Sequence, residues 1–149
     1  MIRNFNLEEI RNVNINHIMS FKDGVNVING LIRSGLTNDL IKLISNKILD
    51  EKINCYYFDT EMTDKLFIRR LIYLSLDKYE ITHNIFHEFN PNPTADDMIK
   101  HIKDTNQKID IIGFDNCYTD DDVKILEDVS ERIGIPVICT RRHLKSEYN

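Results

Sequence analysis

Short apolar runs alternate along this chain with longer segments in which apolar residues recur at helical spacing. The run IDIIGFD, which ends at Asp115, is almost continuously apolar, as in a strand buried on both faces of a parallel sheet. Such alternation predicts repeated strand–helix–strand units and a sheet covered by helices on both faces. We therefore expect an α/β fold of three layers, α-β-α, with a mainly parallel sheet of about five strands. The predicted strands are residues 24–29, 54–59, 84–89, 109–115 and 135–140.

The segments between these strands carry signals for the ends of helices. Thr119 is followed three residues later by Asp122, which is the spacing of a capping box. Gly134 is expected to end the last helix, because glycine readily adopts the left-handed conformation found at helix C-termini. The predicted helices run from Thr37 to about Leu49 and onward from the threonine caps Thr63, Thr94 and Thr119.

Length and composition predict one ordinary globular domain. The chain has 149 residues, of which 42% are hydrophobic and 29% are charged, so it can bury one full core and is not of the disordered class. We expect a single domain over residues 1–149. Within it we expect an N-terminal lead-in segment, 1–20, and a basic C-terminal tail, 141–149.

Charge and apolar content indicate the environment and the partners. The formal net charge of -5 argues against a surface devoted to nucleic acid and leaves direct DNA binding to a local basic patch. No apolar run approaches the roughly 18 residues of a membrane span, so we expect a cytoplasmic protein without a membrane partner. Cys55, Cys117 and Cys139 lack disulfide or metal-site spacing and are expected to be buried thiols. The abundant Ile, Asn and Lys are typical of AT-rich genomes, including those of many phages.

The first predicted strand leads into a loop with the spacing of a phosphate-binding P-loop. The chain reads GLIRSGLT from Gly30 to Thr37, which matches GxxxxGK[ST] except at Leu36, where lysine belongs. In an intact loop, backbone N–H groups hold the phosphates, the lysine reaches the β and γ oxygens, and the hydroxyl binds Mg²⁺. We therefore expect ATP and Mg²⁺ to bind weakly or not at all. A plain strand-to-helix turn is the alternative interpretation.

Over residues 24–144 the chain resembles the RecA-like ATPase core of the DnaB-type replicative helicases. The segment YYFDTEM, which contains Glu61, is similar to the family's strand that closes with Glu-Met, and the strand ending at Asp115 is similar to its Walker B strand. The resemblance implies a RecA-like P-loop NTPase fold. It also implies that Glu61 is the catalytic residue that polarises the attacking water, and that Thr37 and Asp115 hold the metal.

The sequence departs from that family at several points. Leu36 replaces the lysine, and Arg141 and Arg142 stand where a Ser-Gln sensor pair is usual. The family's later strands, DNA-binding loops and arginine finger have no counterpart, so we do not expect unwinding by this chain alone. Arg33, Arg141 and Arg142 are candidates to replace the lost cation, with a solvated basic tail as the alternative for the last two. The expected nucleotide-binding residues are Gly30, Arg33, Ser34, Gly35, Leu36, Thr37, Asp115 and Arg142.

These observations lead to one main hypothesis and two alternatives. The main hypothesis is a degenerate P-loop domain that binds nucleotide weakly or without hydrolysis and serves as an interaction module in DNA replication or recombination. Its partner would be a helicase, another replication protein or further copies of itself. The first alternative is an active ATPase or helicase-related subunit with a surrogate cation. The second is an unrelated flavodoxin-like α/β binding domain, which the strand order would reveal.

Overall fold

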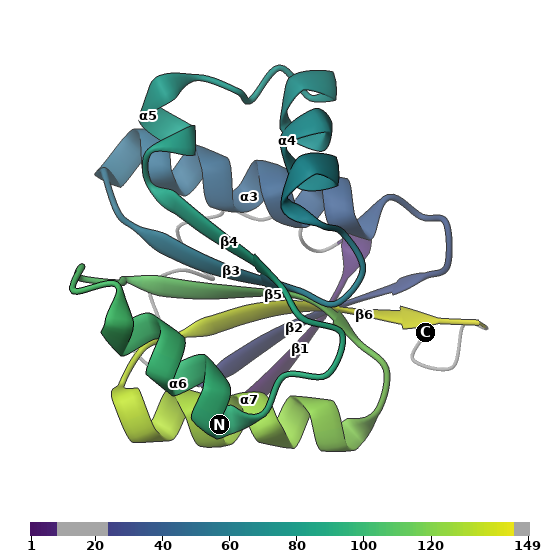
Figure 1. Ribbon diagram of the computed structural model, residues 1–149. Coiled ribbons are helices and arrows are strands. Elements are labelled where there is room, and N and C mark those ends of the chain that lie inside the picture. Colours follow the sequence, from purple (N-terminus) through teal and green to yellow (C-terminus); the bar gives the residue numbers. More distant parts are fainter. Residues whose placement is uncertain (9–23, 145–149) are drawn as a thin grey trace.

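A six-stranded sheet, with every pair of neighbouring strands parallel, lies at the centre of the molecule (Figure 1). The computed structural model describes residues 1–8 and 24–144. The predicted α/β class with a parallel sheet is confirmed, with one strand more than expected. Across the sheet the order is β1-β2-β6-β5-β3-β4. The strands span Ile2–Asn6 (β1), Val25–Leu31 (β2), Cys55–Asp59 (β3), Ile85–Phe89 (β4), Ile111–Cys117 (β5) and Val137–His143 (β6).

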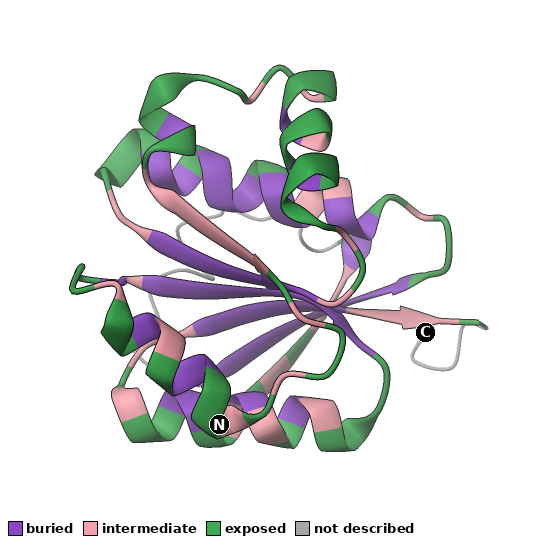
Figure 2. Cartoon of the chain, in the orientation of Figure 1, coloured by how far each residue is buried: buried purple, intermediate pink, exposed green. Residues whose placement is uncertain are grey.

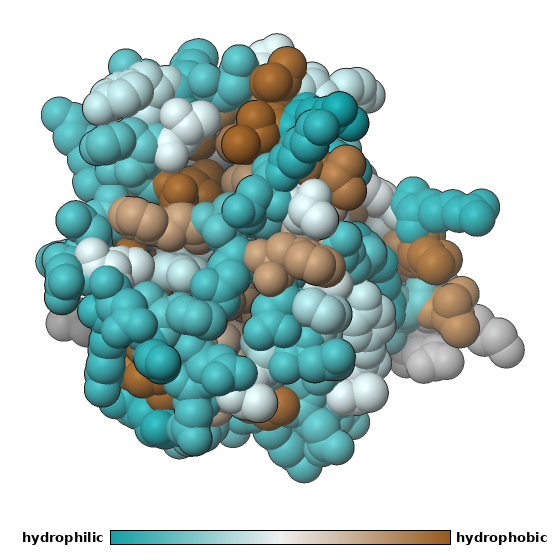
Figure 3. Space-filling model, in the orientation of Figure 1, coloured by the Kyte–Doolittle hydropathy of each residue, from teal (hydrophilic) through white to brown (hydrophobic). Residues whose placement is uncertain are grey.

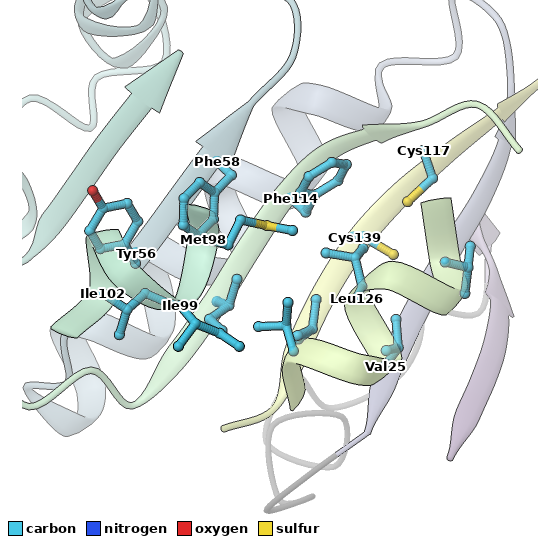
Figure 4. Packing of buried hydrophobic residues seen from close by; sticks show 14 of the residues in the cluster. Val25, Tyr56, Phe58, Met98, Ile99, Ile102, Phe114, Cys117, Leu126 and Cys139 are labelled. Carbon is cyan, nitrogen blue, oxygen red and sulfur yellow. The ribbon is translucent and has the colours of Figure 1, made fainter. Parts of the chain in front are cut away.

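Helices cover both faces of the sheet, which is compatible with the expected three layers. α3, α4 and α5 lie on one face, and α6 and α7 lie on the other (Figure 1). The buried residues gather on the strands and on the helix surfaces turned toward them (Figure 2). On the second face, Met98, Phe114 and Leu126 belong to one apolar cluster between sheet and helices (Figure 4). The helices span Leu36–Glu51 (α3), Asp64–Tyr73 (α4), Tyr79–Thr82 (α5), Ala95–Asp104 (α6) and Asp120–Ile133 (α7).

Threonine side chains start three of these helices at the predicted positions. Thr63 and Thr94 each accept a hydrogen bond from the backbone N–H three residues later. Thr119 and Asp122 form the full capping box at the start of α7. Gly134 ends α7 in the left-handed conformation, with φ 67°. Local capping chemistry therefore fixes where these three helices begin, as the sequence indicates.

Both ends of the chain contribute more to the sheet than expected. Residues 2–6 of the expected lead-in segment form β1, which pairs with β2 along its whole length. Residues 141–143 of the expected tail form the end of β6, where Arg142 pairs with Gly30. These segments are polar and mostly half-buried, so no apolar run marks them; pairing with β2 makes them strands. The rest of the expected lead-in segment and residues 145–149 lie outside the described residues.

The order of the strands speaks against the flavodoxin-like alternative. A flavodoxin-like sheet has the order 2-1-3-4-5, in which the later strands follow one another outward. Here β6, which comes last in the chain, lies between β2 and β5. β2 therefore has a neighbour on each side, and the loop that follows it lies away from the sheet edges.

Two further expectations concern the cysteines and the membrane. Cys55, Cys117 and Cys139 are all free and buried, as predicted. Among residues 1–8 and 24–144, no helix has both the length and the apolar character needed to cross a membrane.

The capping box of α7 gives the first prediction. Thr119→Ala removes the side-chain acceptor for an N–H of the first turn and should lower the free energy of unfolding by about 1 kcal/mol. Thr119→Ser keeps a hydroxyl and is the matched control. Urea unfolding followed by circular dichroism measures both. Equal stability of the two variants would show that the cap does not stabilise this helix.

Candidate phosphate-binding site

The carboxyl edge of the sheet gathers most of the expected site residues. The loop after β2, the turn after β3 and the ends of β5 and β6 all lie at this edge, where parallel α/β sheets place their ligand sites. The structure brings Thr37, Glu61, Asp115 and Arg142 into one connected set of hydrogen bonds and ion pairs. These four residues come from four different elements or loops of the chain.

The loop between β2 and α3 turns sharply because two of its residues adopt left-handed conformations. Arg33 has φ 66° and Gly35 has φ 86°. The Ser34 N–H donates to the Leu31 carbonyl at 3.1 Å and closes the turn. Gly35 is the N-cap of α3 and offers no capping side chain, so the helix begins at Leu36. The first N–H groups of α3 therefore face the loop as an anion-attracting helix end.

Leu36, the residue in the lysine position, is part of the hydrophobic core. Its side chain is only 2% exposed and belongs to the apolar cluster beneath α3. A Cβ atom built on Gly30 would lie 2.8 Å from the Leu36 side chain. Gly30 therefore provides the space that Leu36 fills, and this position contributes apolar packing instead of a cation.

Asp115 lies almost completely buried at the centre of the set. It is 1% exposed, and each of its carboxylate oxygens accepts a hydrogen bond from a threonine hydroxyl. Thr37 Oγ1 donates to Oδ2 at 2.7 Å, and Thr140 Oγ1 donates to Oδ1 at 2.5 Å. Burial raises the pKa of Asp115 above its ordinary value, and the threonines and Arg142 oppose that rise.

Arg142 joins this carboxylate to Glu61. Its Nη2 donates to Thr37 Oγ1 at 2.6 Å and lies 3.7 Å from Asp115 Oδ1, while its Nη1 forms an ion pair with Glu61 Oε1. The Arg142 backbone N–H donates to Asn116 Oδ1 at 3.2 Å, which fixes the strand beside β5. The guanidinium is therefore held between the hydroxyl and the two carboxylates.

A cavity of about 440 Å³ opens beside these groups at the N-terminus of α3. Arg33, Arg70 and Arg142 all line it, together with Gly35 and Thr37. Arginine guanidinium groups and a helix N-terminus both favour bound anions, and arginine matches the geometry of phosphate oxygens. The three arginines and the helix end make this cavity suitable for an anionic ligand.

Of the three arginines expected to replace the lysine, the structure places two at the cavity and one elsewhere. Arg33 and Arg142 line the cavity, whereas Arg141 pairs with Asp120 at the start of α7. Arg70 of α4 was missed by sequence reasoning; its Nη1 donates to Asn38 Oδ1 at 2.7 Å. No motif marks Arg70, because only the packing of α4 beside α3 brings it to the cavity.

A buried carboxylate supports the turn that carries Glu61. Asp59 ends β3 with 0% exposure, and its Oδ1 accepts from the backbone N–H groups of Glu61 and Met62 at 2.9 and 2.8 Å. Its Oδ2 lies 3.1 Å from His87 Nε2, and His87 Nδ1 lies 2.6 Å from Asp64 Oδ1. Sequence reasoning placed Asp59 in a strand and in the segment YYFDTEM, and gave it no role of its own. A carboxylate at the end of a buried strand was the available signal.

Two comparisons with known proteins assign no family to this chain. A scan against models of protein families found no match, and a search of curated protein sequences also found none. The geometry and charge of the cavity are therefore the basis for a functional assignment.

Asp115 gives a prediction on pH and stability. Because its pKa is raised above 3.8 in the folded state, the folded protein binds this proton more readily than the unfolded chain. The associated stabilisation is complete below pH 3.8 and is lost as the pH rises through the raised pKa. Asp115→Asn removes this component. The free energy of unfolding of wild type minus that of the variant should therefore fall as pH rises above 3.8, as measured by urea unfolding.

Asp120→Asn is a control of opposite sign. A hydrogen bond from Arg141 lowers the pKa of this exposed carboxyl below 3.8. Its stabilisation is present above pH 3.8 and is lost as pH falls, so the corresponding difference should rise with pH over the acid range. If the Asp115→Asn difference also rises with pH, burial does not control this carboxyl.

Proposed function

We propose that this chain is a P-loop-type nucleotide-binding domain that holds nucleotide phosphates without hydrolysing them. The observation that carries the proposal is that arginines, and not the residue in the lysine position, supply the positive charge at the start of α3. Leu36 packs into the core, while Arg33, Arg70 and Arg142 line the cavity beside the N-terminus of α3. Each guanidinium can donate charge-assisted hydrogen bonds to phosphate oxygens, so the cavity keeps its attraction for phosphate after the loss of lysine.

The state of Glu61 supports binding without turnover. A general base must be within reach of the attacking water and able to accept its proton. Glu61 forms an ion pair with Arg142, which engages one of its carboxylate oxygens and so competes with that task. The site also lacks the preorganised charge of the lysine. Loss of a single such contact commonly raises the activation barrier by about 3–4 kcal/mol. Slow or absent hydrolysis follows from these two features together.

The partner of such a domain would bind outside the cavity, and α4 offers a surface for it. Leu66 and Tyr73 of α4 are 46% and 79% exposed, and they border a groove of about 250 Å³ with Met62, Arg69 and Arg70. Figure 3 shows hydrophobic residues at the surface where α4 lies in Figure 1. Exposed apolar patches commonly mark interaction sites. This surface supports a role as an interaction module, and we extend the proposal to a module of DNA replication or recombination that docks on a helicase, on another replication protein or on its own copies.

A second candidate is an active ATPase in which an arginine replaces the lysine. Arg142 favours this candidate, since it lines the cavity and touches the hydroxyl of Thr37. The two candidates agree on binding and differ on turnover. Mutation of Glu61, which forms an ion pair with Arg142, can therefore separate the two candidates.

Binding itself is tested with two adjacent arginines of α4. Arg70 lines the cavity, whereas Arg69 borders only the groove on the outer surface, which makes it the matched control. Arg70→Ala removes a charge-assisted donor contributing about 1.5–3 kcal/mol and should weaken a fluorescent ATP analogue about 10- to 100-fold. Arg69→Ala should leave the dissociation constant unchanged. Fluorescence anisotropy, with and without magnesium, measures both dissociation constants. If wild type binds neither in the presence nor in the absence of magnesium, the proposed function is refuted.

Turnover is tested with Glu61→Gln. In the proposed function this change leaves phosphate release at background and strengthens nucleotide binding, because Arg142 loses a competing carboxylate. In the ATPase candidate, loss of the base lowers turnover by about 100-fold or more. Glu80→Gln, at an exposed carboxylate of α5, is the control. Measurable wild-type hydrolysis that disappears in Glu61→Gln would replace the proposed function with the ATPase.

A further inference from the structure

We infer that the guanidinium of Arg142 takes the place of the magnesium ion in this site, so that the pocket binds phosphate chains free of metal. The inference rests on the proposed function and specifies its ligand. The ligand class is a metal-free di- or triphosphate, carried by a nucleotide or as the inorganic anion.

Magnesium requires near-octahedral oxygen ligands at about 2.0–2.1 Å and usually takes them from one or two protein groups, substrate phosphates and water. The resemblance assigns the protein ligands to Thr37 and Asp115. In the structure these residues bind each other, with the Thr37 hydroxyl as donor and Asp115 Oδ2 as acceptor at 2.7 Å. The second carboxylate oxygen accepts from Thr140 at 2.5 Å. Both oxygens of Asp115 are therefore engaged by neutral donors.

The hydroxyl of Thr37 is engaged from the other side as well. Arg142 Nη2 lies 2.6 Å from Thr37 Oγ1, well inside the space that a metal ion and its shell of ligands would occupy. Arginine keeps its positive charge at every accessible pH, so a divalent cation on the same oxygen would meet strong repulsion. The described groups fit a guanidinium at this position and do not fit Mg²⁺ beside it.

Arg142 is held by contacts of both its backbone and its side chain. Its residue pairs with Gly30 across β2 and β6, and its backbone N–H donates to Asn116 of β5. Its contacts with Thr37 and Glu61 engage one donor on each terminal nitrogen, whereas a guanidinium has five N–H donors. Donors therefore remain for a ligand in the cavity that Arg142 lines.

The charge of the cavity agrees with a ligand that carries no metal. Arg33, Arg70 and Arg142 line it, and the first turn of α3 adds the positive end of a helix dipole. A phosphate chain without its divalent cation is more negative than the metal complex. Arginine can neutralise that additional charge through bidentate contacts with phosphate oxygens.

The test measures binding of a fluorescent ATP analogue by anisotropy in EDTA and in a series of magnesium concentrations at constant ionic strength. Wild type should bind about tenfold more tightly in EDTA than in saturating magnesium. Arg142→Ala removes the cation beside Thr37 Oγ1, leaves room for a metal ion there and should reverse this preference, so that binding depends on the metal. Arg142→Lys keeps a cation and should retain the preference for metal-free ligand.

Arg141→Ala is the matched control, because Arg141 is the next residue of β6 and pairs with Asp120 outside the cavity. It should show the wild-type response to magnesium. Competition by inorganic triphosphate in EDTA, compared with nucleoside competition, shows whether the phosphate chain alone carries the affinity. Thermal unfolding of each variant confirms that it is folded before binding is compared.

The outcomes separate this inference from the proposed function. Wild-type binding that requires magnesium would overturn the inference and leave the nucleotide-binding domain in place. An Arg142→Ala variant that is folded and keeps the wild-type preference would also overturn it. No binding of nucleotide or triphosphate in either condition would overturn both.

Discussion

The pairing of β6 with β2 is the constraint on which the site depends. The register runs without a break from Val25 opposite Val137 to Leu31 opposite His143, so β6 follows β2 into the loop. Side chains alternate between the faces of a strand, which places Thr140 and Arg142 on one face and Arg141 on the other. On the α3 face, Thr140 reaches Asp115 and Arg142 reaches Thr37. On the opposite face, Arg141 meets the first turn of α7 instead.

Much of the fold could be predicted because its signals are local. Apolar runs marked the strands, and threonine caps with Gly134 marked the helix ends, since both signals depend on a few neighbouring residues. β1 and the end of β6 carried no such signal. Residues such as Asn4 and Arg142 become strand residues through pairing with β2, and that pairing is a property of the assembled sheet.

The site was predictable where a motif fixed the spacing and unpredictable where packing fixed the contact. The motif indicated the loop from Gly30 to Thr37, and the resemblance indicated Glu61 and Asp115. Arg70 reaches the cavity only through the packing of α4. Alternation along β6 places Arg141 and Arg142 on opposite faces, and the structure shows that the face of Arg142 is the one on which Ile138 packs against the α3 cluster.

The position of Leu36 explains why the cations of the cavity, Arg142 of β6 among them, come from other parts of the fold. Gly30 leaves space beneath the loop, and Leu36 fills it as part of the core, so a lysine there would sacrifice packing of a kind associated with about 2–5 kcal/mol. A cation supplied from β6 leaves that packing intact. That cation, Arg142, lies beside Asp115 and forms an ion pair with Glu61, the residue that the resemblance identifies as the catalytic base. Under the proposed function, the arginine that would bind phosphate also forms the ion pair with the proposed base, so a single side chain favours binding and hinders hydrolysis.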